Sequence, residues 1–237
     1  MMFRSCVHVC YAGWPQPRAD QEVIRPLRIG NASWTLTSSS LMKTEASLDA
    51  LVDVLLAHVE PVATELVEDP EATIEAIFPP VRIRALPDAW TSDECSCDGF
   101  YAADIDPLRP WIVFDSSVTP RRRAHTLLHE LGHHLVATEC CELLEDLDRI
   151  AGDEGNVQSW EERLCHRFAA RLLIPDALLD EVVGDATSFR PEMVGELVSR
   201  GNASWESSAW RIGERLPPQT WIVLLREPGF GGVLSAV

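Results

Sequence analysis

The sequence predicts an α+β fold, in which short strands lead into one central helix and further helices form the second half of the chain. Apolar and basic residues alternate over 81–86, as is typical of a half-buried strand, and two further short apolar runs follow before residue 115. After residue 119, apolar residues recur every three to four positions, as is typical of amphipathic helices. No run of 18 apolar residues is present, so a membrane-spanning helix is not expected.

The N-terminal part is predicted to be a tail followed by a helical segment. Residues 1–41 show no sustained period, which predicts poor order. Met42 directly precedes the first clear helical pattern, so we expect it to be the natural start of the protein. The helical segment is expected over 42–69, with Pro61 ending or kinking its first helix.

Strands are predicted after a second, shorter helix. Asp69 and Pro70 are a helix-capping residue and a first-turn proline, and the helix that they begin is expected to end before Pro79. Three short strands follow in the pattern, at 81–86, 99–102 and 111–114.

The helix after these strands carries the sequence His129-Glu130-Leu131-Gly132-His133. Two histidines four residues apart lie on one helix face and can bind one metal ion, and Glu130 is close enough to reach a water on that ion. Thr119 and Pro120 predict the start of this helix. Gly132 predicts that another piece of backbone passes close by. The alternative is an exposed helix that carries two histidines by chance, but the capped helical context favours the metal site.

Charge and length restrict the class of protein. The 237 residues suit one domain with a tail, or one and a half domains. With 20 basic and 37 acidic residues the net charge is −17, which disfavours binding to a nucleic-acid backbone. The compact basic run Arg121–Arg123 is expected to be a solvated first turn rather than an anchor for an acidic partner.

The chain has seven cysteines, an odd number that cannot all pair with one another, and a chain of this length does not need disulfides to fold. Reduced thiols are therefore expected, and with them a cytoplasmic location. Cys95-x-Cys97 and Cys140-Cys141 lack the spacing of a zinc knuckle.

A third metal ligand is expected on a later helix, which the pattern places from Trp160 to Ile174, before Pro175. Glu162 and His166 are four apart on one face of it, as a ligand and its hydrogen-bonding partner would be. Glu162 is the preferred ligand. His166 is the rival, because three histidines can also hold zinc, and an acidic helix start is the plain alternative reading of Glu161-Glu162.

The two helices together resemble the ImmA/IrrE metallopeptidases. Residues 123–133 are similar to that family's RFTLAHELGH helix, and residues 162–175 to its ExxANxFAAxLLMP helix. The resemblance covers about 70–216. It implies a small thermolysin-like zincin of the gluzincin type over 70–226, with a short N-terminal mixed sheet packed on the active-site helix and a helical C-terminal half. Residues 227–237 are then a tail or an edge strand.

The resemblance also implies roles for single residues. His129, His133 and Glu162 would bind zinc, and Glu130 would be the general base. His125 replaces a usual aromatic residue, so it is a core histidine, a transition-state donor or a competing ligand. His166 replaces a usual Asn or Asp. Zinc is the preferred ion, but the ligand types also suit Mn²⁺ or Fe²⁺.

A peptide hydrolysis mechanism follows from these roles, with a substrate added as a strand to a platform at Trp111, Ile112, Val113 and Phe114. Candidates for stabilising the transition state are Tyr101, His125 and Arg163. The family resemblance implies that the partner is a helix-turn-helix transcriptional repressor in stress-response or mobile-element regulation.

Two other functions are compatible with the sequence. A zinc-stabilised regulatory protein could sequester a repressor without cutting it, although mere binding does not need Glu130. A DNA-binding helix-turn-helix at 193–216 is disfavoured, because Glu206 and Glu214 lie where a recognition helix would be basic.

Overall fold

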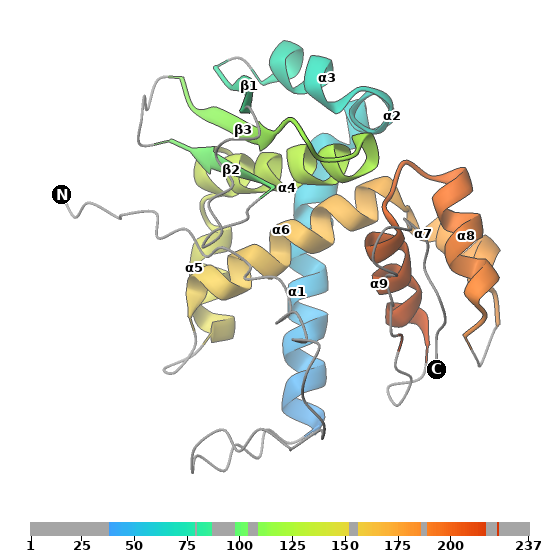
Figure 1. Cartoon of the computed structure of the whole chain (residues 1–237). Helices are drawn as coiled ribbons and strands as arrows, with labels where there is room; N and C mark the ends of the chain where they lie inside the picture. The colour runs from blue at the N-terminus through green and yellow to red at the C-terminus, as the bar shows by residue number, and fades with distance from the viewer. Residues whose placement is uncertain are drawn as a thin grey trace, which may run out of the picture.

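The protein is mostly helical around one small sheet in the computed structural model, which confirms the predicted α+β class (Figure 1). The structure describes residues 38–78, 80–86, 98–103, 109–151, 156–185, 189–216 and 222. Cys95, Cys97 and residues 227–237 lie outside this part of the chain, as do residues 1–37 of the predicted tail.

The N-terminal segment is a series of helices divided by prolines. Helix α1 covers Ser38–Val59 and so begins four residues before Met42. A 3-10 turn, η1 (Glu60–Val62), contains Pro61 and separates α1 from α2 (Ala63–Glu68). Helix α3 (Pro70–Ile77) starts as predicted, because the Asp69 carboxylate accepts a hydrogen bond from the Ala72 N–H at 3.1 Å.

The sheet has three strands, β1 (Arg82–Leu86), β2 (Gly99–Ala102) and β3 (Trp111–Asp115). Their order is β1-β3-β2, with β1 parallel and β2 antiparallel to β3, so the sheet is mixed as expected. The strand at Trp111–Phe114 is therefore central, and both of its sides are already paired. It cannot accept a further strand, which corrects the expectation that a substrate is added at this strand.

Helix α4 (Pro120–Thr138) lies between the sheet and α6 (Val157–Leu173), as Figure 1 shows. Its Leu127, Leu131 and Leu135 are at most 1% exposed and form part of the hydrophobic core. Thr119 occupies the predicted cap position, but its side chain makes no capping hydrogen bond. Burying one stripe of α4 in this way fixes the direction in which its polar residues point.

Helix α5 (Leu143–Ala151) follows α4, and α7 (Asp176–Val183), α8 (Pro191–Arg200) and α9 (Trp205–Arg215) follow α6. Of these helices, α5 and α9 pack against α6, and α7, α8 and α9 pack against one another. Helix α7 was not predicted. The apolar run at 221–225, which predicts a final strand, falls outside the described residues apart from Ile222, and that residue is not in a strand.

Arg211 of α9 joins two of these helices. Its side chain is 2% exposed, donates to the Ile174 carbonyl at 3.2 Å and lies 2.7 Å from Asp176 at the start of α7.

Within the described residues, no helix has the length and apolar character that a bilayer crossing needs.

Candidate metal centre

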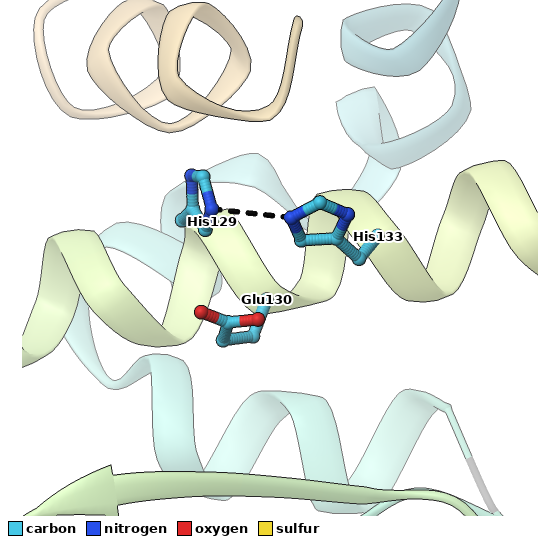
Figure 2. A group of neighbouring side chains, drawn as sticks. All are labelled: His129, Glu130 and His133. Carbon is cyan, nitrogen blue, oxygen red and sulfur yellow. Dashed lines mark hydrogen bonds between the residues drawn. The ribbon is translucent and has the colours of Figure 1, made fainter. Parts of the chain in front are cut away.

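Three side chains from α4 and α6 converge on one point. His129 Nε2 lies 3.2 Å from His133 Nε2 and 3.2 Å from Glu162 Oε2, and His133 Nε2 lies 3.4 Å from Glu162 Oε1. Figure 2 shows the two imidazoles leaving the same side of α4. Ligands bound tetrahedrally at zinc distances are about 3.3–3.4 Å apart. The three side chains therefore already have the spacing that a small divalent ion requires.

Gly132 allows α6 to come this close to α4. A Cβ built on Gly132 would lie 3.1 Å from the Cys165 Sγ, 3.2 Å from its Cβ and 3.3 Å from its Cα. This confirms the prediction that another piece of backbone passes close to Gly132. The same approach brings Glu162, three residues before Cys165, within reach of the two histidines.

Glu161 is a member of the site that the sequence did not single out. Its Oε1 lies 2.8 Å from His133 Nδ1, the ring nitrogen on the far side from Glu162. A carboxylate on the outer nitrogen of a metal-binding histidine fixes the ring orientation and keeps Nε2 free to bind. The acidic pair was visible in the sequence, but which carboxylate points where depends on how α4 and α6 pack together.

The protonation states of two of the three side chains also suit a metal. Burial lowers the pKa of His129 to about 3, so its imidazole is neutral. Burial acts to raise the pKa of Glu162, but hydrogen bonds from His129 and His133 outweigh it and hold that pKa well below 4.5. A neutral imidazole and an ionised carboxylate are the forms that bind metal.

Glu130 lies beside His129 and His133, but its side chain points in a different direction from theirs. It leaves α4 on a different side from the two imidazoles in Figure 2, and its ligand atom is within 4.8 Å of those of His129 and His133. Its carboxylate accepts a hydrogen bond from the Tyr101 backbone N–H of β2. Burial raises the pKa of Glu130 to about 7, which is the range in which a carboxylate can both accept and return a proton.

Comparison with known proteins agrees with this geometry. Residues 97–207 match the peptidase family model described as the IrrE N-terminal-like domain. This part of the chain, just under half of it, is therefore similar to the ImmA/IrrE family. This family is one of metallopeptidases, so a bound metal ion is expected, and the three converging side chains fit one.

Two relatives carry the name radiation response metalloprotease IrrE. The protein from Deinococcus deserti is 36% identical over 124 residues, which cover 51% of this chain and 41% of the relative. The protein from Deinococcus radiodurans is 28% identical over 148 residues, which cover 61% of this chain and 40% of the relative. The chain thus spans about two fifths of the length of these relatives.

A solved structure described as a Mycobacterium tuberculosis transcriptional regulator is also similar. It aligns with a TM-score of 0.43 at 15% identity and covers 78% of this chain and 50% of that chain.

The two histidines that depart from the ImmA/IrrE pattern lie next to His129. The ring centroid of His166 is 4.2 Å from that of His129, and the ring of His125 stacks on His166 at 5.5 Å. Ligand atoms of His129, Glu162 and His166 also lie within 4.8 Å of one another, so His166 remains a rival ligand. Burial lowers the pKa of both His125 and His166.

The other predicted transition-state donors are directed differently. The Tyr101 hydroxyl lies 3.1 Å from His134 Nδ1, and the contact of Tyr101 with the site is through its backbone N–H. The Arg163 guanidinium stacks over the Trp160 ring at 4.4 Å.

Proposed function

We propose that this chain is a zinc-dependent endopeptidase that hydrolyses a peptide bond in a protein partner. The observation that carries the proposal is the triangle of His129, His133 and Glu162 donor atoms at 3.2–3.4 Å, with the buried Glu130 carboxylate beside it. A site that only stabilised the fold would have no use for a fourth, raised-pKa carboxylate next to its ligands.

His129, His133 and Glu162 would hold the ion, and zinc is preferred because imidazole and carboxylate ligands suit its tetrahedral geometry. When bound, such an ion polarises the scissile carbonyl and lowers the pKa of water. With three protein ligands, one coordination position stays open for water or substrate.

Glu130 would carry the proton. Its carboxylate accepts a proton from the attacking water and then donates it to the leaving amine, so the group ends the cycle in its starting state. The Tyr101 N–H fixes the carboxylate in position. His125 or His166 would then be the candidates to donate a hydrogen bond to the developing oxyanion, because both rings lie within 6.3 Å of the His129 ring.

The substrate would be added as a strand at β2, because β2 has an outer side next to Glu130. The Asp115 N–H donates to the Asp98 carbonyl at 2.8 Å, so residues 98, 100 and 102 face β3. The backbone groups of Gly99 and Tyr101 consequently face away from β3. The Tyr101 N–H on this outer side donates a hydrogen bond to the Glu130 carboxylate, so the outer side of β2 lies next to the proposed general base.

The opposite edge of the sheet is less suitable. At β1, the outward N–H of Ile83 already donates to Glu75 Oε1 of α3 at 3.3 Å. An extended substrate beside β2 would have main-chain partners at Gly99 and run past the metal-binding side chains. Trp111–Phe114 would then contact the substrate only indirectly, because they pair with the other side of β2.

The proposed substrate class is a helix-turn-helix transcriptional repressor, and the proposed setting is stress-response or mobile-element regulation. The support is the family resemblance and the two relatives named as radiation response metalloproteases. A cytoplasmic location is part of this proposal, because a repressor is bound to DNA there.

The alternative is that the chain binds a repressor without cutting it. Glu130→Gln separates the two functions, because it keeps the volume of the side chain and removes the base. We expect the zinc-loaded parent chain to cleave a repressor encoded beside it, and Glu130→Gln to bind zinc and the repressor without cleavage. Cleavage by both proteins would refute the mechanism, and binding without cleavage by both would favour sequestration.

A further inference from the structure

Tyr101 of β2 contacts α4 at two points, and neither of them is a proposed metal ligand. The Tyr101 hydroxyl lies 3.1 Å from His134 Nδ1, and the Tyr101 backbone N–H donates a hydrogen bond to the Glu130 carboxylate. Glu130 and His134 are four residues apart, so their side chains lie one above the other on one face of α4. One residue of β2 therefore spans a full turn of the helix that carries the proposed general base.

His134 is itself held in place by its surroundings. The residue is 3% exposed, so its ring has little room to move. The ring meets Phe78 edge-on at a centroid distance of 6.3 Å and Tyr101 edge-on at 5.6 Å. A ring nitrogen of histidine can pair with a hydroxyl whether or not it carries the proton, because a hydroxyl both donates and accepts. The Tyr101 hydroxyl is consequently bound to a group that packing fixes.

Gly99 brings β2 close to α4 along the same stretch. A Cβ built on Gly99 would lie 2.5 Å from Thr126 Cγ2, which is closer than any side chain allows. Thr126, Glu130 and His134 follow one another along α4 at intervals of four residues. Strand β2 thus runs along one face of α4, with Gly99 at one end of the contact and Tyr101 at the other. Since Gly99 also has the main-chain groups proposed for the substrate, the position of the substrate relative to Glu130 depends on how β2 is held.

We propose that His134 is a positioning residue for the hydrolysis: by holding the Tyr101 hydroxyl, it keeps the Tyr101 N–H on Glu130 and fixes the outer side of β2 relative to that carboxylate. This inference rests on the proposed function. It gives the Tyr101 hydroxyl a role other than stabilising the transition state. The group that takes the proton and the strand that receives the substrate are then fixed relative to each other through one side chain.

Amide hydrogen exchange in the purified full chain, followed by NMR, tests this contact without any assay of activity. Tyr101→Phe removes only the hydroxyl, and His134→Leu removes its partner at similar volume. We expect each variant to accelerate exchange of the residue 101 amide by about 2–10-fold, the effect of losing one hydrogen bond. The Phe100 amide, which faces β3, should keep its rate. His134→Gln should restore slow exchange at residue 101, because its amide group can bond the hydroxyl.

Thr126→Val is the matched control for the loss of a hydroxyl. It removes a bond from the Thr126 hydroxyl to the Arg122 carbonyl within α4, at 3.0 Å, and keeps a methyl group next to Gly99. The residue 101 amide should exchange at the parent rate in this variant. In a Glu130→Ala background that amide has lost its acceptor, so Tyr101→Phe should cause no further acceleration there. If His134→Leu does not fold, as judged by circular dichroism, Tyr101→Phe decides alone.

Cleavage of a repressor encoded beside this chain measures the consequence for the reaction. We expect zinc-loaded Tyr101→Phe to have a kcat about 10–100-fold below that of the parent, because small misplacements of reacting groups have effects of this size. Thr126→Val should keep the parent's kcat.

Unchanged exchange at residue 101 in Tyr101→Phe would overturn the proposal, since the hydroxyl would then not hold the N–H on Glu130. Equal acceleration at residue 101 and at Phe100 would also overturn it, because the hydroxyl would then stabilise β2 as a whole. Local acceleration with the parent's kcat would refute the role in hydrolysis. A parent chain that cleaves no repressor would refute the proposed function, and with it that role, while the exchange rates would still decide whether His134 holds Tyr101.

Discussion

Replacing Gly132 with alanine tests whether the close approach of α4 and α6 builds the metal centre. Two effects of the added methyl oppose each other. In a helix interior alanine is favoured over glycine by about 1 kcal/mol. The new Cβ, however, would lie 3.1–3.3 Å from three atoms of Cys165, one of which is the backbone Cα. The helices must therefore separate by a few tenths of an ångström, and overpacking of this kind costs about 1–3 kcal/mol.

The net change expected for Gly132→Ala is a loss of about 0–2 kcal/mol in the free energy of unfolding. Gly195 in α8 is the matched control, because a Cβ there would meet only the Trp205 ring, at an ordinary 3.8 Å. Gly195→Ala should gain up to about 1 kcal/mol from helix propensity alone. The two variants should thus differ by about 1–3 kcal/mol, although the substitution is the same.

Urea unfolding of both variants with a chelator present measures this difference, and cobalt titration measures its effect on the site. Separation of the helices lengthens the distances from Glu162 to the two histidines, so Gly132→Ala should also bind cobalt more weakly than the parent. Gly195→Ala should bind it equally well. Equal stabilisation by both substitutions, with unchanged cobalt affinity, would refute the argument that Gly132 sets the spacing of the site.

Three further predictions concern the metal centre and the ionic contacts of the C-terminal helices. Glu161→Ala should weaken metal binding by about 10–100-fold while the metal stays on its three ligands, as chelator competition would show; parent affinity would contradict its role on His133. Arg211→Ala should lower the free energy of unfolding by about 3 kcal/mol, which is the low end for a broken buried ion pair because the Asp176 side chain is 43% exposed. Urea unfolding measures this loss, and a negligible loss would contradict a stabilising role for Arg211. Burial acts to raise the pKa of Asp176, but Arg171 and Arg211 outweigh it and lower that pKa from 3.8 to about 2, so the stabilising contribution is full above pH 3.8 and lost as the pH falls toward 2. The stability of the parent over Asp176→Asn should accordingly shrink between pH 5 and about 2, and a constant difference would contradict this linkage.

The local features of α4 were predictable from sequence because each has a local cause. Thr119 and Pro120 mark its start, the leucine period defines its buried stripe, and the spacing of four puts His129 and His133 on one face. The two imidazole nitrogens lie 3.2 Å apart as a direct result.

The features that the sequence did not predict depend on packing between distant segments. Glu161 and Glu162 are adjacent, and only the packing of α4 against α6 decides which one bonds the outer nitrogen of His133. The order of the strands is equally non-local: nothing within 111–114 indicates that β1 and β2 pair on either side of it.

Helix α7 is a different case, because its cause is local. Pro175 predicts the end of one helix, but its extended backbone also makes it the cap residue of the next. The apolar positions Leu179, Val182 and Val183 that bury α7 follow the helical period, so this element could have been predicted from the same pattern.

The metal content of the purified chain tests the central claim most directly. The parent, prepared without added metal, should contain about one equivalent of zinc by elemental mass spectrometry, as a site with three protein ligands predicts. Glu162→Ala should contain almost none. A Glu145→Ala control, at an exposed carboxylate of α5 that belongs to neither group of possible metal ligands among the described residues, should match the parent. A parent without metal, or a Glu162→Ala variant that retains it, would contradict the assignment of His129, His133 and Glu162 as the metal centre.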